Sequence, residues 1–405
     1  MRPDNHDSTP LPSSVSPGPA NAELWRGPLT GIRVLELGGI GPAPFAAMLF
    51  ADMGADVIRV DRIPRDDAEA VGADRDHELM NRGKRSIAVD LKSPRGRDVV
   101  LGLIGSVDAV IEGFRPGVAE RLGVGPGDSR ERNARVVYGR ISGWGQLGPW
   151  SHMAGHDINY IALAGVLDGI ARPGAPPTPP LSYIGDFGGG AMFLVWGMAC
   201  ALIERSSSGS GQVVDASILD SAAALSTAFH GLMAANMWAA DYNNDLNGSA
   251  PHYDVYECRD GSYVSIGANE SEFYETFRRV LDLVDPLWDD QMNRASWPER
   301  KAVLREIFLA RTQAEWCDQF AGHDACFAPV LPMEIAHLHP HNKDHATFVE
   351  QGDVIQPAPA PRLSRTPGRI GSRPPRVGAD TTSLLLSLGY SELSIEDLRR
   401  SRVVA

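Results

Sequence analysis

The sequence predicts an α/β protein, with a parallel sheet covered by helices and a second, smaller α+β domain. Compact apolar strands alternate with helical segments from Gly31 to Ile141, which is typical of a parallel sheet. Near Asn247 the pattern changes to an alternating hairpin. The 405 residues, 43% of them hydrophobic and 22% charged, suffice for two domains and exclude a disordered tail protein or a miniprotein.

The first half of the chain repeats strand and helix. Proline in the first turn of the first helix and glycine after its end mark the boundaries of that helix. The predicted strands are Ile32 to Leu37, Asp56 to Val60, Ser86 to Leu91, Asp108 to Glu112 and Arg135 to Ile141, and the predicted helices are Pro42 to Met53, one entered at Ser93-Pro94, and one from about His156. The first strand, helix and strand make a βαβ unit.

The second half begins with an apolar run from Gly188 to Ile203, which is shorter than the roughly 20 residues that span a bilayer and predicts a buried core helix. A strand at Val213 to Ser217 and one long helix from Leu219 to Trp238 follow. Tyr253 to Glu257 and Tyr263 to Ile266 alternate around a turn and predict a hairpin, followed by an amphipathic helix from Glu272 to Leu283. The predicted domains are a disordered leader (1–25), a large domain (26–225), a linker helix (226–246), a small domain (247–330), and a Pro-rich return segment that packs on the large domain (331–405).

Charge and cysteine content narrow the function classes. The formal net charge of −13 makes nucleic acid and anionic membrane poor partners. The four cysteines are far apart and form no CxxC pair, which fits neither a disulfide framework nor a zinc site and favours a reducing cytoplasm.

Two further patterns, a glycine loop and a group of histidines, resemble cofactor or metal motifs but are better explained as a turn and a loop. The glycine loop from Gly38 to Pro44 lies where a dinucleotide fingerprint would lie, with Asp61 ending the next strand, but Pro44 stands where the third glycine is required. We therefore predict a tight turn between strand and helix. The four histidines between His337 and His345 lack metal-ligand spacing and predict a solvated loop, so no metal site is expected.

A basic island stands out in this acidic sequence. Two interpretations remain open, a site for a small polyanionic ligand at the carboxyl ends of the strands or solvated helix faces. The cations are Arg82, Lys84, Arg85, Lys92, Arg95 and Arg97, near which only Asp90 and Asp98 are acidic, together with Arg59, Arg62, Arg115 and Arg121.

Three residues could carry acid–base chemistry, and each has a structural alternative. His156 lies at a predicted helix start, where it is either a base kept neutral by the helix N-terminus or a capping residue. Asp186 precedes three glycines, so it either caps the apolar helix or belongs to a site whose glycines let a ligand approach backbone N–H groups. Glu270 follows the hairpin and is either functional or a surface carboxylate in a first helical turn.

Several stretches, in order and with compatible spacing from about Gly27 to Gly368, resemble one family. They include NRGKRSIAVDLK, SGWGQLGP, GHDINY, GDFGGG and ERSSSGSGQVVDAS. By these stretches the chain resembles the family III CoA-transferase superfamily, and within it the α-methylacyl-CoA racemase branch. The resemblance implies a Rossmann-like large domain, a small domain, and an interlocked homodimer whose active site is shared between the subunits.

The resemblance also implies site residues and a substrate. His156 and Asp186 would be the two bases and Glu270 the residue that orients the histidine, although the neighbours Asn269 and Ser271 are more polar than in familiar racemases, which leaves the acyl pocket open. The implied substrate is an acyl-CoA. Because CoA is part of the substrate, no cofactor is expected. Its contacts would be Arg62, Val89, Asp90, Leu91, Lys92, Gly113, Phe114, Arg115, Arg121, Gly155, Asp157, Ile158, Asn159 and Tyr160.

The implied reaction is inversion of the carbon next to a thioester carbonyl, with one base on each face and no metal, flavin or pyridoxal. Two alternatives remain. A transferase would use Asp186 as a nucleophile that carries CoA, and would need no second base at His156. A catalytically silent acyl-CoA-binding protein would tolerate loss of the acid–base residues.

Overall fold

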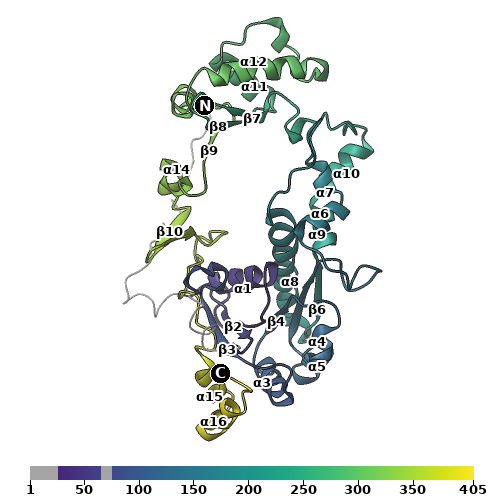
Figure 1. Ribbon diagram of the computed structural model, residues 1–405, viewed down its shortest axis with the longest axis vertical. Helices are drawn as coiled ribbons and strands as arrows, with labels where there is room; N and C mark the ends of the chain where they lie inside the picture. The colour runs from purple at the N-terminus through teal and green to yellow at the C-terminus, as the bar shows by residue number, and fades with distance from the viewer. Residues whose placement is uncertain (1–25, 65–74) are drawn as a thin grey trace. The chain divides into compact units, whose positions relative to one another are not determined.

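The computed structural model describes residues 26–64 and 75–405, so the predicted leader at 1–25 lies outside the described residues. The chain divides into two compact units (Figure 1). The first holds the described residues up to Leu163 together with Pro180–Ala224 and Pro340–Ala405, and the second holds Ala164–Pro179 and Leu225–His339. The second unit therefore begins earlier in the sequence than the small domain expected at 247–330, and it includes a segment from the middle of the large domain.

The first unit is built on a six-stranded parallel sheet in the order β3-β2-β1-β4-β5-β6. Its strands are β1 (Arg33–Leu37), β2 (Asp56–Asp61), β3 (Lys84–Ala88), β4 (Ala109–Glu112), β5 (Val137–Ser142) and β6 (Val213–Ser217). The predicted parallel α/β sheet is confirmed, and its strand order is that of a doubly wound Rossmann fold. The order reverses between β1 and β4, so this sheet has its switch point there.

Helices cover both faces of this sheet, because alternate residues of each strand point to opposite sides. On one face Val34, Val57 and Ile111 pack with α1 and α8, and on the other Leu35, Ile58 and the remaining alternate residues pack with α3 and the C-terminal helices. The helices of the first unit, not all of which lie on the sheet, are α1 (Pro42–Asp52), α3 (Pro94–Ile104), α4 (Val118–Arg121), α5 (Pro126–Arg132), α6 (Asp157–Leu163), α8 (Met192–Ser208), α9 (Ile218–Leu225), α14 (Pro340–Asp344), α15 (Thr381–Ser387) and α16 (Glu392–Arg400). Short 3₁₀ turns lie at η2 (Arg75–His77) and η3 (Leu79–Asn81).

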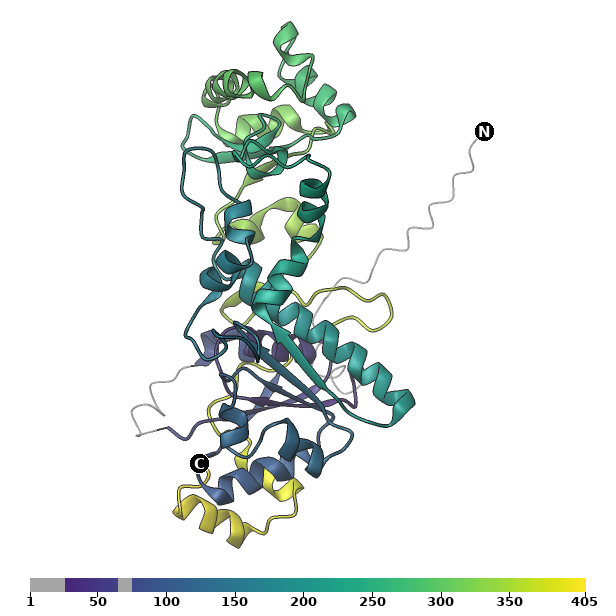
Figure 2. The ribbon, with the colours of Figure 1, turned by 90° about the vertical axis from the view of Figure 1, so that its right-hand side faces the viewer.

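The C-terminal segment packs against the first sheet. Strands β10 (Phe348–Gln351) and β11 (Val354–Pro357) form a hairpin, and the following chain reaches α15 and α16, which lie beside α3 (Figure 2). The backbone N–H of Asp90 donates to the carbonyl of Val403 at 2.9 Å. Leu384, Leu385 and Ile395 belong to the same buried cluster as the sheet, so the last residues complete the core on this face.

The apolar run that predicts a buried core helix is buried on one side only, so that prediction is wrong. A wide π-helical segment, η4 (Tyr183–Ala191), leads into α8, whose buried residues follow a single stripe of Leu194, Met198, Ala201 and Arg205. Trp196 and Ile203 are 66% and 71% exposed. The apolar composition of a helix does not show which of its faces are buried within its own chain.

This helix is also the one stretch among the described residues, Tyr183–Ser208, whose length and composition would suffice to cross a membrane. Helices that pack against protein surfaces have the same length and composition.

The single long helix expected at 219–238 is interrupted. Ser226, with φ −87° and ψ 5°, separates α9 from α10 (Thr227–Ala234), and the boundary between the two compact units lies beside it. Ser221 lies in the same Ala- and Leu-rich run without breaking it, so Ser226 alone is too weak a signal to predict this break.

The second unit contains a three-stranded antiparallel sheet, which includes the predicted hairpin. Its strands are β7 (Tyr253–Glu257), β8 (Tyr263–Gly267) and β9 (Phe327–Val330). Aromatic residues such as Phe277, Phe308 and Trp316 form its core. Its helices are α7 (Val166–Gly169), α10, α11 (Ser271–Val280), α12 (Trp297–Leu309) and α13 (Gln313–Phe320), with 3₁₀ turns at η5 (Asp245–Asn247), η6 (Pro286–Trp288), η7 (Arg294–Ser296) and η8 (Ala336–Leu338).

A buried ion pair should contribute strongly to the stability of the first unit. The Arg82 guanidinium pairs with Asp52 at 2.5 Å, and both side chains are buried. It also donates to Gln356 Oε1 at 2.8 Å and to the Pro357 carbonyl at 3.1 Å, which ties the C-terminal segment to α1. Arg82→Met leaves the Asp52 carboxylate unpaired, so we expect the free energy of unfolding in urea to fall by about 3–5 kcal/mol.

The matched control for this variant is Arg95→Met, which removes an exposed pair with Asp397 and should change the free energy of unfolding by about 0–1 kcal/mol. Equal effects of the two substitutions would contradict the structural role assigned to Arg82.

Candidate active site

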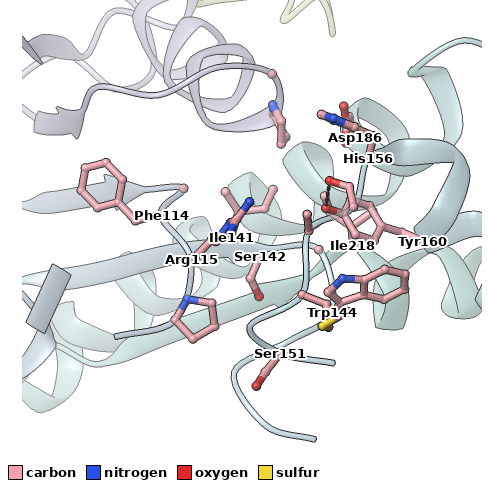
Figure 3. Close-up of a pocket in the computed structure, with 18 of the residues that line it drawn as sticks. Phe114, Arg115, Ile141, Ser142, Trp144, Ser151, His156, Tyr160, Asp186 and Ile218 are labelled. Carbon is pink, nitrogen blue, oxygen red and sulfur yellow. Dashed lines mark hydrogen bonds between the residues drawn. The ribbon is translucent and has the colours of Figure 1, made fainter. Parts of the chain in front are cut away.

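A cavity of about 320 Å³ lies at the carboxyl ends of β1, β4 and β5 (Figure 3). It is lined by the loops that follow these strands, among them Ile40 to Pro42 after β1 and Gly113 to Pro116 after β4. Strands β1 and β4 flank the switch point of the sheet, which is where open α/β sheets bind their ligands. The glycine loop is the predicted tight turn, since Gly41 has φ 70° and directly precedes α1.

Asp186 reaches this cavity from η4, and Asp157 holds it in place. The backbone N–H of Asp186 donates to the Asp157 carboxylate at 2.6 Å, and the N–H of Gly185 bonds to the same carboxylate. Burial, and after it the charge of Asp157, raises the pKa of Asp186 to about 6, against smaller lowering effects of Ser182 and His156. A carboxyl with this pKa can carry a proton near neutral pH, which an ordinary aspartate cannot.

The glycines around Asp186 pack closely within the protein, and the alternative that they let a ligand approach backbone N–H groups stays a prediction. A Cβ added to Gly185 would lie 2.5 Å from the Asp157 carboxylate, and one on Gly190 would lie 2.8 Å from Ile141. A Cβ on Gly189 would lie 3.0 Å from the Ile184 carbonyl oxygen. The motif GDFGGG therefore lets η4 pack tightly, which fixes the position of Asp186.

His156 lines the same cavity at the start of α6 (Figure 3). Its backbone N–H donates to Asn159 Oδ1 at 3.0 Å, and its carbonyl accepts the N–H of Asn159 at 2.8 Å. This reciprocal bonding fixes the backbone of the first turn and leaves the imidazole exposed beside Asp186. The capping role considered for His156 is thus fulfilled by its backbone, and its ring is available for chemistry.

An aromatic group joins the loop after β5 to the loop that carries His156. Trp144 meets Tyr160 edge to face, with ring centroids 4.7 Å apart, and the Tyr160 hydroxyl donates to the carbonyl of Gly155. A Cβ on Gly143 would lie 2.1 Å from the Tyr160 ring. Gly143 and Trp144 were not among the predicted site residues, although the motif SGWGQLGP could have indicated a close approach of backbone to a ring.

Glu112 was also missed. This fully buried carboxylate ends β4 and accepts the backbone N–H of Phe114 at 2.7 Å. Burial raises its pKa to about 7, although the Phe114 N–H and Arg140 oppose the shift. Glu112 therefore fixes the loop of Phe114 and Arg115 at the edge of the cavity. The sequence does not predict this role, because Glu112 ends a strand whose other residues are mostly apolar.

The basic island is largely neutralised by carboxylates, because six of its cations form ion pairs. Glu36 pairs with both Arg59 and Lys84. The other paired cations form ion pairs with carboxylates that are either distant or adjacent in the sequence. The six paired cations are Arg59, Arg82, Lys84, Arg85, Arg95 and Arg97. Within residues 26–64 and 75–405, Arg62, Lys92, Arg115 and Arg121 form no ion pair and are exposed.

The structure brings some of the expected contact residues to the cavity and leaves others away from it. Those that line it are Gly113, Phe114, Arg115, Gly155 and Tyr160, together with His156 and Asp186. Arg62, Val89, Asp90, Leu91, Lys92, Arg121, Asp157, Ile158 and Asn159 do not line it. The Val89 side chain is buried in the core, and its backbone pairs with Val404.

Glu270 lies in the second unit, between β8 and α11. It is the residue that precedes α11, yet its side chain makes no capping hydrogen bond and is exposed. Its carboxylate is consequently available to a partner outside its own helix.

Among the described residues, no group of three His, Cys, Asp or Glu side chains is arranged to hold a metal ion. His341 and His345, from the histidine-rich segment, stack on each other with centroids 5.7 Å apart. His341 lies in the short helix α14, where a loop was expected.

Comparison with known proteins identifies the family of this chain. The model of CoA-transferase family III matches residues 29–381. The chain belongs to the family III CoA-transferases. It is 41% identical over 379 residues to the alpha-methylacyl-CoA racemase of Mus musculus, with 93% of this chain and 97% of the relative covered, and 40% identical over 380 residues to the Homo sapiens racemase, with the same coverage. A CAIB/BAIF family protein from Brucella suis shares the fold, with a TM-score of 0.76 and 24% identity over 90% of this chain and 100% of that one.

The electrostatic coupling between the two aspartates can be tested by Asp157→Asn. The amide keeps an oxygen to accept the Asp186 N–H but removes the neighbouring negative charge, so we expect the pKa of Asp186 to fall from about 6 toward its ordinary value. Titration of carbonyl-labelled aspartate by NMR measures this shift. Asp220→Asn, an exposed carboxylate that does not affect the pKa of Asp186, is the control. An unchanged or higher pKa in Asp157→Asn would contradict the coupling.

Proposed function

We propose that this protein racemises 2-methylacyl-CoA thioesters by moving the proton on the carbon next to the carbonyl. The observation that carries the proposal is that a carboxyl with a pKa raised to about 6, Asp186, lines the same cavity as the exposed imidazole of His156. Similarity over 97% of the mouse racemase supports the same reaction. A carboxyl that can donate a proton and an imidazole that can accept one are the two groups that this reaction requires.

In the proposed reaction, neutral His156 removes the α-proton from one face of the substrate. The electron pair of the broken C–H bond moves into an enolate, and the carboxylic acid of Asp186 returns a proton to the opposite face. The product has the inverted configuration, His156 is then protonated and Asp186 ionised, and the reverse reaction exchanges the roles. The raised pKa keeps Asp186 partly protonated at the pH where an imidazole is still a base.

The CoA portion of the substrate would be bound by the free cations. Arg62, Lys92, Arg115 and Arg121 carry no carboxylate partner within the part of the chain that is described, and these four were expected to contact CoA. Exposed cations without an internal partner can bind the phosphates of a polyanion, which supports this assignment. The reaction requires no resident cofactor, because the thioester itself acidifies the α-proton.

We propose further that two copies of the chain interlock and that Glu270 of one copy orients His156 of the other. The uncapped, exposed carboxylate of Glu270 supports the second part. The exposed apolar side chains of α8, Trp196 and Ile203, support an interface with a second copy. Four free thiols are compatible with a reducing cytoplasm as the site of the reaction.

Deuterium incorporation tests the proposed reaction. One enantiomer of a 2-methylacyl-CoA, incubated in D₂O without an acceptor acid, should gain deuterium at the α-carbon while the enantiomer ratio drifts toward a mixture. His156→Ala and Asp186→Asn should each lower this rate by about 10²–10⁴-fold, because each removes one of the two bases. His152→Ala, an exposed histidine of the same loop, should leave the rate unchanged.

The transferase alternative gives a different result in the same assay. Absence of exchange over several acyl chains, with CoA transfer once a free carboxylic acid is added, would refute racemisation and make Asp186 the nucleophile.

A further inference from the structure

The side chain of Gln291 holds the backbone that leads into Glu270. Its amide group donates to two consecutive carbonyl oxygens, those of Ala268 at 3.0 Å and of Asn269 at 2.8 Å. These are the two residues directly before Glu270. Because one amide group bonds both carbonyls, the backbone here can neither shift along its axis nor rotate a peptide plane without breaking one of the bonds.

Gln291 is itself held by two buried side chains of α12. Its backbone carbonyl accepts the Trp297 indole N–H at 3.0 Å and the Arg300 guanidinium at 3.2 Å, and Arg300 also donates to the carbonyl of Asp290 at 2.6 Å. Trp297 and Arg300 are each 1% exposed. The irregular segment at 289–293 is thereby fixed to the core of the second unit.

Arg300 is unusual because a fully buried charge normally pairs with a carboxylate. Among the described residues it forms no ion pair, and its guanidinium bonds backbone carbonyls and lies 5.9 Å from the Trp288 ring. Burial, and after it the charge of Arg300, lowers the pKa of the neighbouring His252 to about 4, so this histidine adds no second charge near neutral pH. Both terminal nitrogens of Arg300, Nη1 and Nη2, therefore donate to the segment that carries Gln291.

A second contact links η6, directly before the segment at 289–293, to the helix that follows Glu270. The Tyr274 hydroxyl donates to the Trp288 carbonyl at 3.0 Å, and the Tyr274 N–H bonds the carbonyl of Glu270 at 2.9 Å. The backbone of Glu270 is thus fixed on both sides, while its carboxylate makes no capping bond. A rigid backbone that carries a carboxylate without a capping bond is the arrangement expected where that carboxylate must be oriented toward a partner.

We propose that Gln291, anchored by Arg300, is a positioning residue that sets the direction of the Glu270 carboxylate toward the imidazole it orients. This inference rests on the proposed function, in which Glu270 acts on His156. Loss of the Gln291 amide should impair proton transfer and leave CoA binding intact, because every CoA-contact residue expected from the sequence lies in the first unit.

The test compares Gln291→Met with Gln319→Met. Methionine keeps the length of the side chain and removes its donor. Gln319 offers a matched control, because its amide likewise donates to a backbone carbonyl, that of Val280 at 2.8 Å. Val280 is the last residue of α11, at the opposite end of the helix from Glu270. In the deuterium assay, Gln291→Met should lower kcat about tenfold with KM within about twofold of the wild type, and Gln319→Met should change neither.

A double variant distinguishes positioning from a general loss of stability. If Gln291 acts through Glu270, adding Gln291→Met to Glu270→Gln should lower kcat less than about twofold further, because the partner it positions is already lost. An additional tenfold loss in that background, or equal losses in Gln291→Met and Gln319→Met, would overturn the inference. Wild-type kcat in Gln291→Met would overturn it as well.

Amide hydrogen exchange separates this inference from the proposed function. The peptide spanning 268–275 should exchange about tenfold faster in Gln291→Met than in the wild type or in Gln319→Met, whatever reaction the protein catalyses. If the wild type moves no α-proton, the proposed function fails and this exchange alone decides: faster exchange confirms the backbone restraint, and unchanged exchange overturns it.

Discussion

The hydrogen bond from the Asp186 N–H to the Asp157 carboxylate, 2.6 Å long, joins the two halves of the candidate active site. Asp157 directly follows His156 in sequence, so the position of the imidazole and that of the Asp186 carboxyl are fixed relative to each other across 29 residues of chain. Burial raises the pKa of Asp186, and the negative charge of Asp157 beside it raises that pKa further. The Asp157 side chain thus fixes the backbone of Asp186 and adds to the proton affinity that the proposed reaction requires.

Charged groups are also buried in the sheet beside the loops that line the cavity. Glu36 pairs with Lys84 at 2.7 Å beneath the loop that follows β1, and Glu112 accepts the Phe114 N–H at the end of β4. Burial of such groups is tolerated because each has partners, and the result is loops of defined shape around the switch point. Four cations that form no ion pair within residues 26–64 and 75–405 are exposed, where they can bind the phosphates of a ligand.

Periodicity predicts the strands of the sheet to within a few residues, because buried parallel strands are continuous apolar runs. It does not reveal the partner of a charge. Arg82 pairs with a carboxylate 30 residues earlier and bonds an amide oxygen 274 residues later, so it looked free in the sequence. The exposed face of α8 and the packing of Gly143 against Tyr160 depend equally on tertiary contacts, whereas His156 and Asp186 were found because their motifs resemble those of the family.

The most direct test of the central claim is a crystal structure with a CoA thioester whose acyl group mimics the planar enolate. Our account predicts that the α-carbon lies between the imidazole of His156 and the carboxyl of Asp186, with one group on each face, and that the CoA phosphates contact Arg62, Lys92, Arg115 or Arg121. Both groups on the same face of the acyl plane, or a covalent bond between Asp186 and the ligand, would contradict it.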